Sequence, residues 1–186
     1  MSILFIALPI VEPVEDLFFP LQDGVPGADW HDPGDHHLTL AFLGEVPDHR
    51  IVDLAAKLAA LRSDQFTLEL SGVGHFPPRG KPKVLWAGVA HSEALERLER
   101  KVAHAVHELG LPMDERKFAP HITLARLHDS PPHRVAEWLA DCNLLSSDTW
   151  EVNEFALFAS HRAPEGSRYE VLRRFALDPL ESATRT

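Results

Sequence analysis

The sequence of 186 residues has little cysteine, fewer basic than acidic residues, and no long apolar run. Its single cysteine, Cys142, excludes an internal disulfide and a two-cysteine metal site. Lys and Arg number 18 against 28 Asp and Glu, and the resulting formal charge of −10 argues against the broad basic surface that binds polyanions of any sequence. A local basic pocket for one phosphate is compatible with this charge, because net charge does not describe a single site.

The apolar segment near the N-terminus, residues 3–11, is too short to cross a bilayer and contains Pro9. No basic residue precedes it, as one would in a secretory signal. Together with the scarcity of cysteine, this predicts a cytoplasmic protein with no membrane partner. The length and a hydrophobic content of 45% fit one well-filled core, so we expect a single monomeric domain over residues 1–186, flexible after about residue 178.

Periodicity and turn residues divide the chain into strands and helices without a long linker. Strands are predicted at 3–8, 36–42, 66–73, 84–89, 121–127, 152–159 and 168–177. Helices are predicted at 51–61, from a Ser92 cap to Gly110, and from Ser130-Pro131 onward, while one around 12–21 is interrupted by Pro13 and Pro20. The Gly-, Pro- and Asp-rich segment 24–34 is predicted to be a loop.

This order repeats one unit, in which a strand, a histidine-bearing strand, a helix and further strands follow one another. It predicts an α+β fold, bilobal and pseudo-symmetric, with two antiparallel-rich sheets that face a central groove and helices on the outside.

Two pentapeptides repeat one another, HLTLA at 37–41 and HITLA at 121–125. On a strand, alternate side chains share a face, so the histidine and threonine of each copy stand together about 7 Å apart along the strand. The leucines and the isoleucine point the other way, toward the helices. The facing groups are therefore His37 with Thr39 and His121 with Thr123.

A single His-x-Thr motif could belong to an ordinary half-buried strand with one polar face. Two matching copies instead favour a cleft that both motifs share. Two imidazoles there suit in-line phosphoryl chemistry, because one neutral ring can take a proton from the nucleophile while a protonated ring gives one to the leaving oxygen. An unperturbed pKa of about 6.5 lets both forms exist near neutral pH. The threonine hydroxyls can donate to the non-bridging phosphate oxygens.

A metal site is the competing interpretation of a chain with 12 histidines. His36 and His37 are adjacent, so on a strand they face opposite sides and cannot share an ion. Asp32 and Asp35 could join such a site, but the chain has no HExxH motif or cysteine cluster. We therefore expect neither a metal nor another cofactor.

The sequence resembles the two-histidine (2H) phosphoesterase superfamily, whose signature is two copies of His-x-Thr/Ser bracketed by apolar residues. It is most similar to the bacterial and archaeal RNA 2',3'-cyclic phosphodiesterases, formerly called 2'-5' RNA ligases. The matching positions run through nearly the whole chain: 4–8, Trp30, 37–40 with 42–44, 72–74 with 76–77, 82–88, Phe118 with 120–126, and Tyr169. Two departures are the doubled His36-His37, in which register makes His37 the family histidine, and Pro20 where the family runs its first helix.

The resemblance implies a bilobal fold with a central groove and metal-free hydrolysis of a 2',3'-cyclic phosphate, on an RNA end or a nucleotide, to a 2'-phosphate. It makes His37 and His121 the acid–base pair and assigns phosphate binding to Thr39 and Thr123. By analogy with related enzymes, His37 is the acid and His121 the base. Two alternatives are reversible 2'-5' RNA ligation at the same site and a non-catalytic module that binds RNA ends or nucleotides.

Arg126 and Phe5 are further candidates for substrate contacts. Arg126 lies five residues after His121, so strand parity places it on the opposite face. The resemblance favours a phosphate or nucleotide role, which a bulge or the end of the strand would permit, against a surface ion pair. Phe5 could offer its ring to a base or pack in the core, and the same two readings apply to Trp30 and Phe118.

A turn-rich basic stretch, with Arg79, Lys81 and Lys83, lies between two predicted strands. It is either a rim that contacts RNA phosphates or a solvated hairpin loop. Arg116 and Lys117, just before the second motif, could extend the rim.

Overall fold

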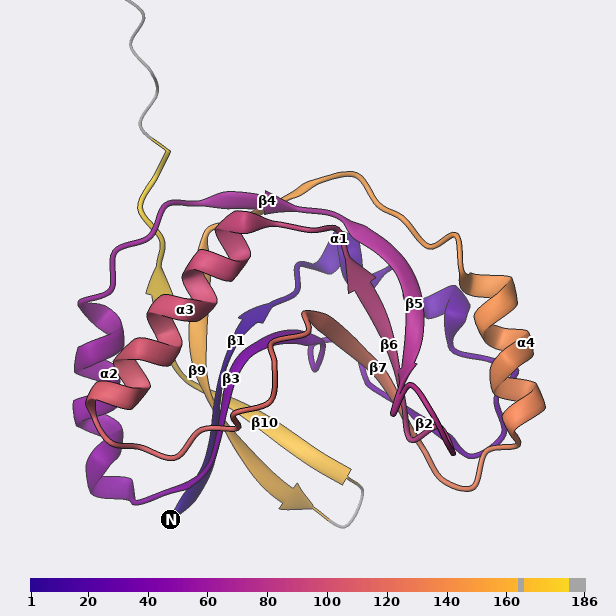
Figure 1. Cartoon of the computed structure of the whole chain (residues 1–186), viewed down its shortest axis with the longest axis horizontal. Helices are drawn as coiled ribbons and strands as arrows, with labels where there is room; N and C mark the ends of the chain where they lie inside the picture. Colours follow the sequence, from indigo (N-terminus) through magenta and orange to yellow (C-terminus); the bar gives the residue numbers. More distant parts are fainter. Residues whose placement is uncertain (164–165, 181–186) are drawn as a thin grey trace, which may run out of the picture.

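A computed structural model describes residues 1–163 and 166–180 (Figure 1). The strands are β1 (Ser2–Pro9), β2 (Ala28–Trp30), β3 (His37–Val46), β4 (Phe66–Leu68), β5 (Leu70–Phe76), β6 (Val84–Val89), β7 (His121–Leu127), β8 (Trp150–Val152), β9 (Glu154–Ala163) and β10 (Gly166–Ala176). The α-helices are α1 (Glu12–Glu15), α2 (Ile51–Ala59), α3 (Glu93–Glu108) and α4 (Pro132–Cys142), and short 3-10 turns lie at Phe19–Leu21 and Asp48–Arg50.

The α+β class is confirmed, but the prediction of two sheets is corrected to one main sheet of eight strands. Its order is β10-β9-β1-β3-β7-β6-β5, with β2 paired to β7, and a separate ribbon joins β4 to β8. The two halves of the main sheet meet where β3 and β7 pair at Leu38 and Ile122. Backbone pairing at this one point makes the sheet continuous, and the halves diverge from it (Figure 1).

Helices cover one side of each half. Figure 1 shows α2 and α3 outside the half that contains β1 and β3, and α4 outside the half that contains β6 and β7. The main core fills this side and includes the apolar residues that alternate with the histidine and threonine of each motif. These residues are at most 4% exposed: Leu38, Leu40, Ile122 and Leu124. Burying each of these side chains contributes roughly 1.5–3 kcal/mol.

On the opposite face of the sheet, Phe5, Ala7, Ala156 and Phe158 form a small apolar cluster, with Tyr169 packed against it. This face is therefore the one on which polar side chains of β3 and β7 can be presented to a ligand.

Local signals placed most elements correctly. The Ser92 hydroxyl accepts the Leu95 N–H at 3.2 Å, and Gly110 takes a positive φ of 62° just beyond α3. The helix expected at 12–21 is broken: α1 ends at Glu15, with Pro13 in its first turn, and Pro20 falls in the following 3-10 turn. The strand expected at 66–73 is split into β4 and β5, and the loop expected at 24–34 contains β2.

The C-terminal segment is anchored as far as Asp178, whose carboxylate pairs with Arg62 at 3.0 Å. Of the tail expected to be flexible, residues 181–186 lie outside the described residues. In the part of the chain that the structure describes, no helix combines the length and apolar character needed to span a membrane.

Candidate active site

The strands β3 and β7 carry the same irregularity at the same place in their motifs. Relative to β1, Leu40 is an extra residue in β3, and relative to β6, Leu124 is an extra residue in β7. Each bulge shifts the alternation by one position, so Phe42 and Arg126 lie on the same side as the histidine and threonine. The bulge at Leu124 therefore reverses the side that strand alternation predicted for Arg126. Arg126 lies on the face that carries the histidine and threonine of both motifs, the motif face.

Both motifs converge at the centre of the sheet. His37 and His121 are each adjacent to one residue of the Leu38–Ile122 pair, and both histidines, with Thr39 and Thr123, are half-buried on the face opposite the core.

His37 is held by its backbone neighbour. Its Nδ1–H donates to the carbonyl oxygen of Asp35 at 2.8 Å, which leaves Nε2 of the neutral ring free to accept a proton. Burial lowers the pKa of His37 to about 4, although the hydrogen bond to Asp35 opposes this shift. The nearby positive charges of His36, His121 and Arg126 lower that pKa further.

His121 is held in the same way. Its Nδ1–H donates to the carbonyl oxygen of Ala119 at 2.7 Å, and the Phe76 ring lies edge-on to it at 4.8 Å. Burial lowers the pKa of His121, the hydrogen bond to Ala119 opposes this, and the charge of Arg116 adds to the lowering. At neutral pH the free site therefore holds two neutral rings.

Phe5 does not have the exposure that base stacking requires. It is 3% exposed, and its ring stacks on Phe158 at 4.9 Å, with the ring of His37 at 4.7 Å. Its burial favours a packing role beside His37 over the predicted contact with a base. Trp30 and Phe118 likewise pack against the main core.

Glu15 is a site residue that the sequence analysis missed. Its carboxylate accepts the Gly34 N–H at 3.0 and 3.1 Å and the His36 Nδ1–H at 3.0 Å. These bonds hold the segment that presents the Asp35 carbonyl to His37. No sequence signal marked Glu15, because it ends a four-residue helix that contains Pro13 and is too short to show a periodicity.

His31 and His36 are two further histidines near His37. His36 is 3% exposed and its ring centroid lies 6.0 Å from that of His31. Burial lowers the pKa of His31 to about 3, and the charges of His37, His36 and Arg126 contribute. Within residues 1–163 and 166–180, no three His, Cys, Asp or Glu side chains are grouped as a metal ion would require.

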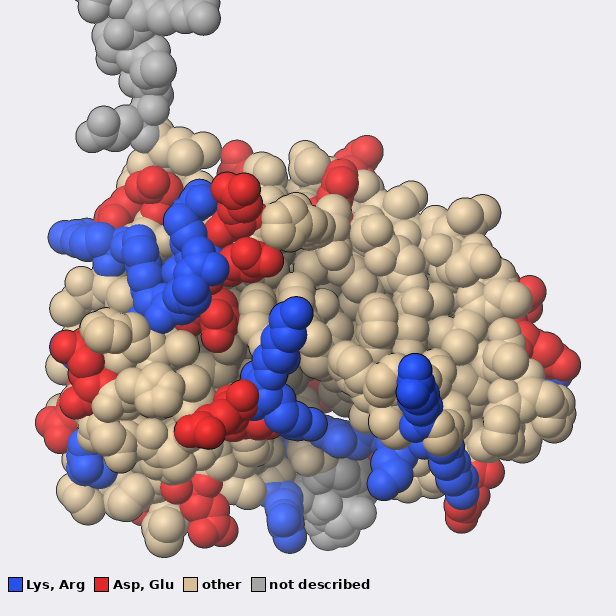
Figure 2. All heavy atoms as spheres, in the orientation of Figure 1, with Lys and Arg blue, Asp and Glu red and all other residues tan. Residues whose placement is uncertain are grey.

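Exposed basic residues occupy two segments near the motifs. Arg79, Lys81 and Lys83 are exposed in the turn between β5 and β6, and Arg116 and Lys117 are exposed in the loop before β7. Figure 2 shows basic side chains over both segments, beside the opening between the halves of the sheet.

Comparison with known proteins agrees with this geometry. A family model for the 2'-5' RNA ligase superfamily matches residues 21–164. The RNA 2',3'-cyclic phosphodiesterase of Thermus thermophilus is 36% identical over 186 residues, covering 94% of this chain and 89% of that protein. The protein of the same description from Geobacillus stearothermophilus is 33% identical over 179 residues, covering 93% of this chain but only 56% of the relative.

Solved structures match over almost the whole chain. The Thermus thermophilus protein TT0787 superposes with a TM-score of 0.81 at 30% identity, covering 96% of this chain and 99% of that one. E. coli LigT complexed with 3'-AMP superposes with a TM-score of 0.75 at 27% identity, covering 95% and 98%. The chain therefore belongs to the 2'-5' RNA ligase superfamily, in the family of RNA 2',3'-cyclic phosphodiesterases.

Proposed function

We propose that this protein opens the 2',3'-cyclic phosphate of an RNA end or a nucleotide to a 2'-phosphate, without a metal. The observation that carries the proposal is the matched pair His37 and His121, each with Nδ1 bound to a backbone carbonyl and Nε2 left for chemistry. The names of the relatives support the substrate class. The complex of LigT with 3'-AMP supports a nucleotide as ligand.

The two histidines divide the proton transfers. A water molecule attacks phosphorus and gives its proton to neutral His121, while the bond from phosphorus to the 3'-oxygen breaks and protonated His37 donates to that oxygen. The products are a 2'-phosphate and a free 3'-hydroxyl, and the proton on His121 returns to His37 through solvent. This assignment follows the analogy with related enzymes.

Substrate binding supplies the charge that this mechanism needs. Burial favours the neutral form of both rings in the free protein, whereas the acid must be protonated. A bound cyclic phosphate carries a negative charge, which favours the protonated form of an adjacent imidazole. The site is therefore expected to take up a proton as the substrate binds.

Thr39, Thr123 and Arg126 complete the site from the same face. The threonine hydroxyls donate to the non-bridging oxygens and fix phosphorus between the rings. The guanidinium of Arg126 stabilises the charge that builds on those oxygens during attack.

An RNA end fits better than a free nucleotide because of the basic turns. On a protein with a formal charge of −10, Arg79, Lys83 and Lys117 offer local contacts for the phosphates of a longer strand. Ligation is the same reaction with a 5'-hydroxyl in place of water, and hydrolysis prevails unless both RNA ends are held together.

The test is the product formed from an oligoribonucleotide that ends in a 2',3'-cyclic phosphate, incubated with the protein in EDTA. The expected product carries a 2'-phosphate, and an added 5'-hydroxyl oligonucleotide yields little ligated RNA. A 3'-phosphate product, or activity only after Zn²⁺ or Mn²⁺ is restored, would overturn the proposal. Quenching of tryptophan fluorescence without any product would identify a binding module.

A further inference from the structure

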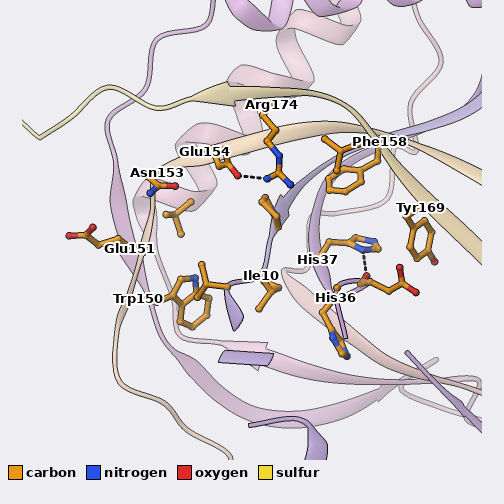
Figure 3. A pocket seen from close by; sticks show the side chains of 16 residues that line it. Ile10, His36, His37, Trp150, Glu151, Asn153, Glu154, Phe158, Tyr169 and Arg174 are labelled. Carbon is orange, nitrogen blue, oxygen red and sulfur yellow. Dashed lines mark hydrogen bonds and ion pairs between the residues drawn. The ribbon is translucent and has the colours of Figure 1, made fainter. Parts of the chain in front are cut away.

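A cavity of about 340 Å³ opens beside His37 (Figure 3). It lies between the end of β1, the segment before β3, the corner between β8 and β9, and β10. Phe158 and Tyr169, which belong to the aromatic cluster around His37, line it as well. The cavity is therefore continuous with the catalytic face on the His37 side.

The lining has apolar walls and a polar end. Ile10 and Val171 contribute aliphatic surface, and Val171 is 36% exposed. Away from His37, the Arg174 guanidinium pairs with the Glu154 carboxylate, as Figure 3 shows. Both side chains of this pair keep part of their surface exposed, so a donor and an acceptor remain available to a ligand.

We propose that this cavity holds the base of the nucleoside that carries the cyclic phosphate, with Arg174 and Glu154 contacting the polar edge of the base. The inference rests on the function proposed above. Ring opening leaves the 3'-oxygen on the same ribose as the base, so the nucleoside and the acid that protonates this oxygen lie on one side of phosphorus. The attacking water lies on the other side. A nucleoside beside His37 is consistent with His37 as the acid.

Size and charge distinguish a base from other occupants. The volume falls within the range of small-ligand pockets, roughly 300–1,000 Å³. A base has two flat faces that suit apolar walls and an edge with donors and acceptors that suits an Arg–Glu pair. A second phosphate would meet the carboxylates of Asp35, Glu151 and Glu154 with only one Lys or Arg, Arg174, in the lining.

The experiment compares substrates with and without a base. 2',3'-cyclic AMP carries one, and glycerol 1,2-cyclic phosphate has the same reactive ring without it. Arg174→Ala is expected to raise KM for cyclic AMP about tenfold, with kcat changed by less than roughly twofold and glycerol cyclic phosphate unaffected. Arg173→Ala is the matched control, because its guanidinium lies 5.7 Å from the Phe175 ring and outside the cavity.

Val171→Trp fills the cavity without breaking the ion pair, and it is expected to raise KM for cyclic AMP alone. If the wild-type protein opens both esters and both variants leave KM for cyclic AMP unchanged, or alter the two esters equally, the cavity does not hold the base. If the wild-type protein opens an oligoribonucleotide 2',3'-cyclic phosphate but not cyclic AMP, the inference alone fails. If it opens none of the three substrates, the proposed function fails, and the inference fails with it.

Discussion

His37 and His121 are held by one device: the Nδ1–H of each ring donates to the carbonyl oxygen two residues earlier, at 2.8 Å and 2.7 Å. A carbonyl only accepts, so each neutral ring has its proton on Nδ1 and its lone pair on Nε2. Two strands from different halves of the chain thus present equivalent proton acceptors to one face. Two-histidine acid–base chemistry requires this arrangement.

The first prediction concerns pH. The active free protein has one proton on the histidine pair, whose pKa values lie at about 4 for His37 and below 6.5 for His121. The plot of kcat/KM against pH is therefore expected to be bell-shaped with its optimum below pH 6.5, because the pair loses its last proton as the pH rises. Bound phosphate favours the charged form, so the kcat profile is displaced to higher pH.

Initial rates from pH 4 to 9 with a cyclic nucleotide measure both profiles. A sigmoidal curve with one ionisation, or a kcat/KM optimum on the alkaline side of neutrality, would contradict this account of the two rings.

The second prediction concerns Arg126, which the bulge at Leu124 places on the motif face. Loss of a charge-assisted bond to phosphate costs about 1.5–3 kcal/mol, so Arg126→Ala is expected to lower kcat/KM by roughly 10- to 150-fold. Arg126→Lys keeps the charge and is expected to recover part of the loss. Arg134→Ala provides the control, since Arg134 pairs with Glu137 on α4. If the Arg126 and Arg134 variants are equally active, Arg126 does not contact the phosphate, and a surface ion pair is the better interpretation.

The third prediction concerns Glu15 as a positioning residue. Glu15→Gln removes the negative charge and leaves one oxygen to accept from both the Gly34 N–H and the His36 ring. Both bonds weaken, so the Asp35 carbonyl is held less firmly against His37. We expect kcat to fall about tenfold with KM nearly unchanged.

Glu12→Gln is the matched control for this variant, because Glu12 is an exposed carboxylate of the same short helix. The tautomer of His37, read from its ¹⁵N NMR shifts, is expected to lose its preference for Nδ1–H only in Glu15→Gln. A kcat equal to wild type, or a fall in melting temperature that accounts for the whole loss, would rule out positioning.

The motif strands and the helices α2, α3 and α4 could be predicted because their periodicities are strong. Alternation put His37 with Thr39 and His121 with Thr123, and the leucines of both frames lie in the core as expected. The side on which Arg126 lies could not be derived from alternation, because a single extra residue reverses parity beyond it. The bulge becomes visible only when β6 is paired with β7.

Other features depend on contacts distant in sequence. The two halves form one sheet through the pairing of Leu38 with Ile122, and no local pattern specifies that pair. Phe5 belongs to β1, which is flanked by β3 and β9 and buried on both faces, so alternation did not show that its ring is covered. Glu15 contacts Gly34 and His36 across about 20 residues, from a helix with no periodic signal.

The central claim is that His37 and His121 act together on one phosphate. The most direct test is single-turnover opening of an oligoribonucleotide 2',3'-cyclic phosphate by His37→Gln, His121→Gln and the double variant, with His104→Gln as control because His104 is exposed on α3. Each single variant is expected to lose about 10²–10⁴-fold in rate, and the double variant little more, because the two rings work as a unit. If either single variant kept the wild-type rate while remaining folded, the two-histidine account would be wrong.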